Sequence, residues 1–235
     1  MGGCDGCASS GSCPSYSSGD SCSTGSCGGE KKLPPGMLEN YNTNQSTADG
    51  TLVFIEVSDK KGVQAIEPVS KQLLGKASEM GGGRIFGVIF GGPERKELYK
   101  EALSYGVDTL YHVRDPRLST FHPEAYAESI AAVCERIIPA VVLFGSTPRG
   151  AELAPRAAAS MGTGIVTDCS DLAIEGRMLS MFRVSEGKKV RYECVTFPQV
   201  ATVKEGVFPS PAAQEGRGGT AFYWQYGGNG FKQTL

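Results

Sequence analysis

From residue 51 onward, short aliphatic runs alternate with longer amphipathic segments. We predict a strand for each aliphatic run: Leu52–Val57, Ile85–Phe90, Thr109–Val113, Val141–Phe144 and Ile165–Asp168. Near-continuous apolar runs are typical of parallel strands that are buried on both faces, with helices covering the sheet. The pattern therefore predicts an α/β fold with a doubly wound, mostly parallel sheet.

Four amphipathic segments fit between these strands as helices. The first, Val63–Met80, has apolar residues at three- and four-residue spacing. The second spans about Glu94–Ser104, and the third, Pro123–Ile138, has a proline suited to its first turn. The fourth follows the turn at 145–150, and its small apolar residues predict close packing of this helix against the sheet.

Beyond Asp171 the pattern changes to alternating polar and apolar residues. Arg177–Val184 and Lys189–Thr196 predict a β-hairpin around residues 186–187, and Gln199–Val203 follows as a further strand of the same meander. We therefore expect an antiparallel strand addition beside the parallel sheet.

The final stretch, Gly216–Leu235, combines glycines with five aromatic side chains. Two interpretations stay open for it. The stretch folds back onto the sheet of its own domain, or it serves as a docking strand for another subunit, since Trp and Tyr are frequent anchors at interfaces.

The composition excludes several classes of function. The chain has 235 residues, with 23 Lys and Arg against 25 Asp and Glu, so no cationic field attracts nucleic acid. The longest apolar run, Ile137–Phe144, is far shorter than the roughly 20 residues of a membrane span, so we expect no membrane insertion. The N-terminus lacks the pattern of a secretory signal, and we expect a cytoplasmic protein.

Residues 1–50 are dominated by Ser, Gly, Cys, Asn and Pro, and we expect an extension and linker without a core of its own. Five of the eight cysteines lie in this segment: Cys4, Cys7, Cys13, Cys22 and Cys27. Clustered thiols in a reducing compartment suggest metal or redox chemistry. Three hypotheses stay open: an iron–sulfur cluster such as [4Fe-4S], a zinc site, or a tail that binds no metal.

The turn after Val141–Phe144 is the best candidate for ligand binding. A strand, a small-residue turn and a helix place unpaired amides at the carboxyl edge of a sheet, where phosphates of nucleotides such as AMP bind. The candidate residues are Gly145, Ser146, Thr147, Arg149, Gly150 and Arg156. The alternative is that Ser-Thr-Pro only begins a helix well. The turn has neither a Walker lysine nor a Gly-x-Gly-x-x-Gly spacing, so a kinase or a dehydrogenase is not supported.

No catalytic motif surrounds the two histidines, His112 and His122, and we expect no enzyme activity from this chain alone. We also expect Cys134, Cys169 and Cys194 to be small buried hydrophobic residues.

Leu143–Ala159 and Gly162–Asp168 together form a long continuous motif, and Val53–Glu56 and Ala201–Phe208 are shorter ones. This set of motifs resembles the alpha subunit of electron-transfer flavoprotein, over roughly residues 51–208. The resemblance implies an adenine-nucleotide-hydrolase-like domain that pairs with a beta-type subunit. It also implies that a second, C-terminal domain holds most of the FAD, and no later segment here carries the motifs of that domain.

Two positions depart from the family pattern. Ala151 stands where the family usually has a basic residue, and residues 185–189 replace an expected Gly-Gly-Asn segment. Contacts to a flavin or a partner at these positions are therefore in doubt.

The sequence thus predicts an extension at 1–50, an electron-transfer-flavoprotein-like domain at 51–208 and a tail at 209–235. The resemblance implies a subunit of an electron-carrier complex between a flavin dehydrogenase and an acceptor, with FAD held mainly by partner chains. The rival hypothesis is a stand-alone nucleotide-binding or sensor domain for AMP or ATP. A metal-carrying scaffold is a third.

Overall fold

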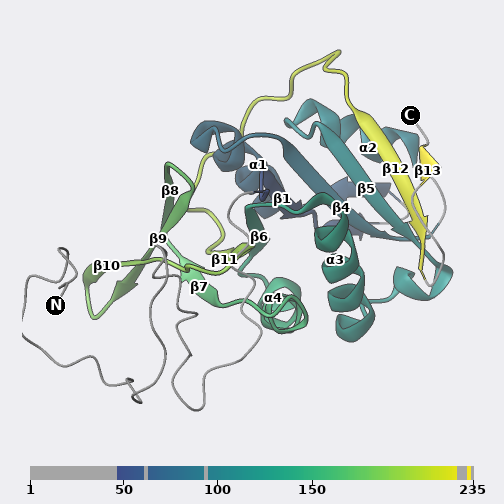
Figure 1. Ribbon diagram of the computed structural model, residues 1–235. Helices are drawn as coiled ribbons and strands as arrows, with labels where there is room; N and C mark the ends of the chain where they lie inside the picture. The colour runs from purple at the N-terminus through teal and green to yellow at the C-terminus, as the bar shows by residue number, and fades with distance from the viewer. Residues whose placement is uncertain (1–46, 61–62, 93–94, 227–231, 234–235) are drawn as a thin grey trace, which may run out of the picture. The chain divides into compact units, whose positions relative to one another are not determined.

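Figure 1 shows the fold as a computed structural model, which describes residues 47–60, 63–92, 95–226 and 232–233. The main sheet of this described part has eight strands, of which the seven from β12 to β7 run parallel. In order across the sheet they are β13 (Lys232–Gln233), β12 (Thr220–Gln225), β5 (Thr109–Arg114), β4 (Ile85–Gly91), β1 (Thr51–Phe54), β6 (Val141–Gly145), β11 (Gln199–Val203) and β7 (Ile165–Cys169). The doubly wound, mostly parallel fold is confirmed.

Helices cover both faces of the sheet. They are α1 (Pro68–Met80), α2 (Lys96–Ser104), α3 (Pro123–Ile137) and α4 (Pro148–Ser160), with a short 3₁₀ helix η1 (Pro116–Ser119). Buried residues of α1 and α2 share one hydrophobic cluster with the sheet, and those of α3 and α4 share another. Central strands are therefore mostly apolar along their whole length, because consecutive side chains enter opposite clusters.

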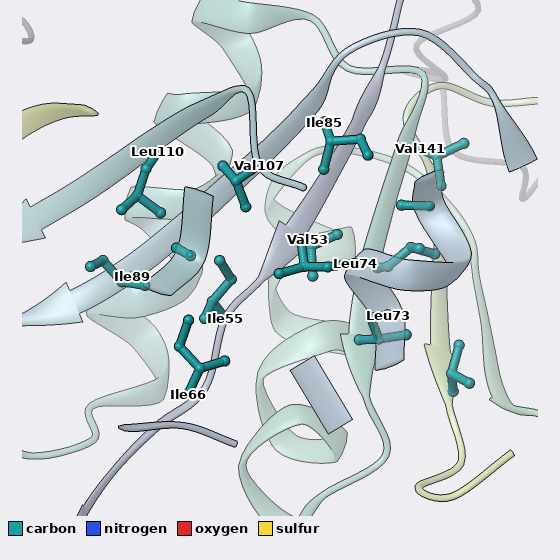
Figure 2. Packing of buried hydrophobic residues seen from close by; sticks show 14 of the residues in the cluster. Val53, Ile55, Ile66, Leu73, Leu74, Ile85, Ile89, Val107, Leu110 and Val141 are labelled. Carbon is teal, nitrogen blue, oxygen red and sulfur yellow. The ribbon is translucent and has the colours of Figure 1, made fainter. Parts of the chain in front are cut away.

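Strand β1 illustrates this division. Val53 and Ile55, which follows the strand, belong to the first cluster, whereas Leu52 and Phe54 belong to the second. Figure 2 shows the first cluster, with Leu73 and Leu74 of α1 near Val53. The two clusters are built on the same strands, so the packing on each face of the sheet depends on strands that the other face also holds in place.

The predicted first helix is wrong at its N-terminal end. Residues 63–66 form strand β3 (Val63–Ile66), which pairs with β2 (Val57–Lys60) in an antiparallel hairpin. The reason is Pro68, because the residue before a proline avoids the helical region. Glu67 accordingly has an extended backbone at φ −63° and ψ 145°, and the helix begins at Pro68.

The predicted place of Gln199–Val203 in the antiparallel meander is also wrong. This segment, β11, runs parallel between β6 and β7, and all five of its residues are buried. Burial on both faces is what an interior parallel strand requires. The side chain of Gln199 accepts a hydrogen bond from Leu179 N at 2.7 Å and donates one to Arg177 O at 2.9 Å, so its burial leaves no polar atom unpaired.

A separate three-stranded antiparallel sheet comprises β8 (Asp171–Glu175), β9 (Met178–Ser185) and β10 (Lys188–Tyr192), in the order β10, β9, β8. The predicted hairpin is confirmed as β9 and β10. Its turn has Glu186 and Gly187 at φ 50° and 75°, the pair of positive angles typical of a two-residue hairpin. On β10, Lys189 pairs with Asp171 and Arg191 pairs with Glu175.

The C-terminal stretch folds back as a strand of its own domain. After β11 the chain passes α1 and α2, where Gln214 N donates to Ser104 O at 2.8 Å and Arg217 pairs with Asp108 at 2.7 Å. It then forms β12, parallel to β5 at one side of the sheet (Figure 1). The ring of Phe222 stacks on that of Tyr111 at 5.8 Å.

The remaining sequence predictions concern the cysteines, a metal site and a membrane span. The extension and its five cysteines, Cys4, Cys7, Cys13, Cys22 and Cys27, lie outside the described residues. Within the described ranges, the side chains form no cluster suited to a metal ion, and no helix has the length and apolar character of a membrane span. Cys134 and Cys169 are buried as predicted, and Cys194 is only half-buried.

Candidate functional site

The order in which successive strands are added to the sheet reverses between the neighbouring parallel strands β1 and β6. From β1 the chain adds β4 and β5 on one side of the sheet, and it returns to add β6 and β11 on the other. In open α/β sheets, ligands bind in the crevice at the carboxyl ends of the strands that flank such a switch point. The predicted ligand turn, residues 145–150, lies at this crevice because it follows β6.

The side chain of Thr147 bridges the ends of the two strands that flank the crevice. As the N-cap of α4, its Oγ1 accepts a hydrogen bond from Gly150 N at 3.0 Å. The same hydroxyl donates to Glu56 Oε1 at 2.6 Å and so joins the end of β6 to the end of β1. One amide that the sequence offered to a phosphate is therefore already bonded within the protein.

The two glycines of the turn are explained by packing. A Cβ at Gly150 would lie 2.0 Å from Gly145 O, and a Cβ at Gly145 would lie 2.7 Å from a methyl carbon of Val69. Real Cβ atoms do not approach so closely. The absence of side chains at these positions lets α4 and α1 approach β6, whether or not a ligand binds.

Ser146 also has partners within the protein. Its Oγ lies 2.8 Å from Thr202 Oγ1 on β11, which in turn accepts a hydrogen bond from Asp168 N at 2.9 Å. This chain of bonds links the ends of β6, β11 and β7. The side chain of Ser146 therefore helps to hold these three strand ends together.

The two arginines of the predicted site are not brought together. Arg156, on the outer face of α4, forms ion pairs with Glu124 at 3.5 Å and Glu152 at 3.4 Å. Arg149, in the first turn, lies near β2, with its Nη1 3.5 Å from Val57 O, and lines a cleft. Of the predicted residues, Arg149 alone lines this cleft.

The cleft lies between the carboxyl ends of β1 and β4, under the β2–β3 hairpin, and has a volume of about 210 Å³. Its polar lining residues are Glu56, Asp59, Gln64, Arg95, Ser119 and Arg149. Glu56 has an exposed fraction of 6%, and this burial raises the pKa of its carboxyl group, opposed by the hydrogen bond from Thr147. The sequence analysis missed Glu56 and Arg95 as site residues. An acidic residue directly after a buried strand was the available signal for Glu56.

A buried polar network lies close to the cleft. Arg114 Nη2 donates to Tyr99 Oη at 2.9 Å, so the phenol donates its own proton to His112 Nδ1 at 2.6 Å. Burial, together with the guanidinium groups of Arg114 and Arg95, lowers the pKa of His112 to about 3. His112 is therefore a neutral structural residue that holds β5 against α2.

A larger cavity of about 300 Å³ lies between the C-terminal ends of α3 and α4, next to Ile138, Met161 and Phe197. It is far from the switch point, because these helices end where the chain enters the amino ends of β6 and β7. Ligands of open α/β sheets bind at the opposite end of the strands. The smaller cleft is therefore the better candidate site.

Comparison with known proteins assigns the fold to a family. A model of the electron transfer flavoprotein domain matches residues 51–222. The chain is 32% identical to electron transfer flavoprotein subunit alpha of Clostridium acetobutylicum over 173 residues, which are 70% of this chain and 50% of the relative. It is also 32% identical to that subunit of Thermoanaerobacterium thermosaccharolyticum over 157 residues, 64% of this chain and 48% of the relative.

A third relative has a different name. Lactate dehydrogenase (NAD(+),ferredoxin) subunit LctC of Acetobacterium woodii is 32% identical over 193 residues, which are 77% of this chain and 45% of the relative. The chain spans about half the length of the relatives it matches. The match at 51–222 begins with β1 and ends within β12, so it includes the parallel sheet and its covering helices. The chain belongs to the electron transfer flavoprotein domain family.

Proposed function

We propose that this chain is a non-catalytic subunit of an electron-transfer-flavoprotein-type complex. It pairs with a beta-type subunit, and the complex relays electrons from a flavin dehydrogenase or another oxidoreductase to an acceptor. FAD is held mainly by partner chains. The observation that carries this proposal is the family match over residues 51–222, which covers nearly all of the described fold.

The geometry of the sheet edge supports the assignment of FAD to a partner. The crevice at the switch point is bridged by the hydrogen bond between Thr147 and Glu56. The neighbouring cleft, at about 210 Å³, is smaller than the roughly 300–1,000 Å³ of ordinary small-molecule sites. A dinucleotide such as FAD needs more room than either place offers.

The names of the relatives support electron transfer as the process. Two are alpha subunits of electron transfer flavoproteins, and the name of the third includes both NAD(+) and ferredoxin. The chain spans about half their length, so their names do not fix its electron donor, its electron acceptor or the direction of electron flow. These three are to be determined by experiment.

Co-expression with a beta-type subunit tests the proposal. We expect the two chains to elute together in size-exclusion chromatography, and the complex to show the absorption of a bound flavin. The chain alone serves as the control and is expected to elute without flavin. Separate elution at micromolar concentration would contradict the pairing, and tight FAD binding by the chain alone would contradict the assignment of the flavin to a partner.

The rival hypothesis, an AMP or ATP sensor at residues 145–150, has less support. The hydroxyl of Thr147 and the amide of Gly150 bond each other, and Ser146 bonds Thr202. Arg156 is paired with glutamates outside the cleft. No specific observation at this turn favours a nucleotide there over a well-capped helix.

The N-terminal cysteines remain a separate hypothesis, since they lie outside the described residues. If Cys4, Cys7, Cys13, Cys22 and Cys27 supply thiolates to an iron–sulfur cluster, the cluster gives the complex a one-electron relay. Anaerobic purification with iron, sulfide and zinc analysis tests this. Iron-free, colourless protein after cluster reconstitution would exclude the cluster, and zinc in its place would favour the zinc site.

A further inference from the structure

The larger cavity, of about 300 Å³, combines an apolar wall with negative charge, and the proposed scaffold role of the chain uses neither. We propose that it binds a small organic amine in its protonated form, with the ammonium group beside Glu135 and the apolar body of the amine against Ile138 and Phe197. The site lies at the amino ends of the strands. It depends neither on a flavin nor on a partner subunit.

The cavity lies where two helices and a loop meet. Helices α3 and α4 pack against each other (Figure 1), and their last turns form two walls. The loop before β11, with Phe197 and Pro198, forms a third. Phe197 and Cys134 are 1% and 5% exposed, whereas Ile138 is 38% exposed. The cavity therefore extends from an open rim to a buried floor.

The charge around the cavity favours a cation. Among the lining residues that the structure describes, Glu135 alone is charged. The C-terminal ends of α3 and α4 add partial negative charge, about half an elementary charge each. Burial raises the pKa of the Cys134 thiol, and the charge of Glu135 raises it further, so the negative potential reaches the floor. The charge of the next residue, Arg136, acts elsewhere, since it opposes the rise that burial causes in the pKa of Tyr111 on β5.

The backbone of Ile138 supplies an independent argument. Ile138 is the C-cap of α3, with φ 47° and ψ 61°, a left-handed conformation in which Gly or Asn is the usual residue. Two hydrogen bonds hold it there: Ile138 N donates to Cys134 O at 2.8 Å, and Asp49 N donates to Ile138 O at 3.0 Å. A β-branched residue is strained in this conformation.

The fold does not offset this strain by burying the side chain of Ile138, which stays partly exposed at the rim. A glycine or an asparagine would relieve the strain but would remove the apolar contact. An apolar ligand that covers the isoleucine buries that surface and so accounts for the residue at this position.

Volume and charge together define the ligand. At about 300 Å³ the cavity is at the lower limit of the roughly 300–1,000 Å³ of small-molecule sites, so it has room for an amine with one ring or a short chain. A free amine enters with its apolar body first and leaves its charge at the rim, near Glu135 and water. A lysine side chain of another protein enters with its charge first and would place it on the buried floor, where desolvation is costly.

Isothermal titration calorimetry on the full chain at pH 7.5 tests the proposal with three ligands that share one ring. These are 2-phenylethylamine, 2-phenylethanol and phenylacetate, which carry positive, zero and negative charge. We expect the amine to bind at least about fivefold tighter than the other two, because the carboxylate and the two helix ends each contribute modestly. If 2-phenylethylamine and hexylamine both fail to bind at millimolar concentration, or if the alcohol binds as tightly as the amine, the proposal is overturned.

Two further ligands separate the parts of the proposal. Ethylamine keeps the charge but has little apolar body, and it should bind more weakly than 2-phenylethylamine. The amide of Nα-acetyl-lysine represents a lysine side chain of another protein and should also bind more weakly. Tighter binding of the lysine derivative would identify a protein partner in place of a free amine and refute the proposal.

Variants of two lining residues locate the binding. Glu135→Gln should weaken 2-phenylethylamine by about threefold to tenfold and leave 2-phenylethanol unchanged, since it removes only the charge. Ala131→Phe, which fills the cavity, should abolish binding of both, with folding checked by circular dichroism. Glu97→Gln, on α2 at the other face of the sheet, is the matched control and should bind normally. An equal loss in Glu97→Gln, or unchanged binding in a folded Ala131→Phe, would place the ligand elsewhere and refute the site.

Ile138→Asn tests the argument from strain. Because Asn adopts the left-handed conformation readily, the urea midpoint should stay the same or rise, while binding of 2-phenylethylamine should weaken at least about fivefold. Normal binding in a stable variant would refute the contact with Ile138. A clearly lower midpoint would show that the fold itself, and not a ligand, requires the isoleucine.

Discussion

At the scale of single residues, Gly150 is the glycine of the described residues that leaves least room for a side chain. Alanine there would place a Cβ 2.0 Å from Gly145 O, and the backbone of α4 would have to move. We expect Gly150→Ala to lower the free energy of unfolding by about 3 kcal/mol, as overpacking does in tight cores. Urea denaturation measures this. Gly218→Ala is the matched control, because nothing lies within 4 Å of that position, and a comparable loss in it would contradict the explanation.

His112 predicts a dependence of stability on pH. Its pKa is about 3 in the folded protein, against 6.5 for an ordinary histidine, and Tyr99, Arg114 and Arg95 surround it. Below pH 6.5 the unfolded chain takes up a proton that the folded chain refuses, so stability falls as the pH falls from 6.5 toward 3. Between pH 7.5 and pH 5 this amounts to about 2 kcal/mol.

Urea denaturation at several pH values measures the effect of His112. The variant His112→Gln should be less stable at pH 7.5 but should lose less stability between pH 7.5 and pH 5. If the variant and the unmodified chain have the same slope, the histidine is not the titrating group.

At the scale of elements, the N-terminus of α4 depends on one hydroxyl group. Thr147→Ala removes the cap of the helix and leaves Glu56 without its donor, so we expect a loss of about 2 kcal/mol in the free energy of unfolding. Thr147→Ser keeps the hydroxyl and should lose under half as much. Thermal unfolding of both variants decides between a role of the hydroxyl and a role of the methyl group.

The strand β12 makes a second prediction at this scale. A chain that ends after Gly216 lacks the strand that covers β5, the ring stacked on Tyr111 and the partner of Arg114 at Tyr223. We expect a clearly lower urea midpoint for this chain. Where it does not fold, Phe222→Ala should show a smaller loss of the same sign, against little change for the exposed Gln225→Ala. Unchanged stability in both shortened and substituted chains would restore the docking interpretation of the tail.

The elements also show what the sequence can predict. Long aliphatic runs such as Val141–Phe144 identify strands buried on both faces, and the hairpin turn at Glu186 and Gly187 is a local signal. The failures involve information of other kinds. Pro68 divides an apparently continuous helical pattern, and only long-range packing places Gln199–Val203 between β6 and β7.

The candidate site was predictable in part for the same reason. The Ser-Thr-Pro run indicates that a helix begins near this turn, but only the structure shows that Thr147 is its N-cap and that the same hydroxyl bonds Glu56, 91 residues earlier. Arg95 and Arg149 meet at one cleft because β1 and β4 are neighbours and α4 begins beside them. Contacts between such distant positions leave no periodic signal in a single sequence.

At the scale of the whole molecule, the two hydrophobic clusters share one continuous sheet, and the described residues form one compact unit. We expect these residues to unfold in a single transition. The chain has one tryptophan, Trp224 on β12, so its fluorescence reports on the edge of the sheet, while far-UV circular dichroism reports on all elements. The two signals should change at the same urea concentration. An earlier change in fluorescence would show that β12 detaches before the rest.

The antiparallel sheet has a further consequence for behaviour at high concentration. One of its two outer strands, β10, carries Lys188, Lys189 and Arg191 along five residues. An outer strand with free backbone groups invites pairing with the same strand of another copy, and like charges on both copies oppose that pairing. Because Lys189 and Arg191 are paired with Asp171 and Glu175, we expect the repulsion between two copies to come mainly from Lys188 and to be strongest in dilute salt, where it is least screened.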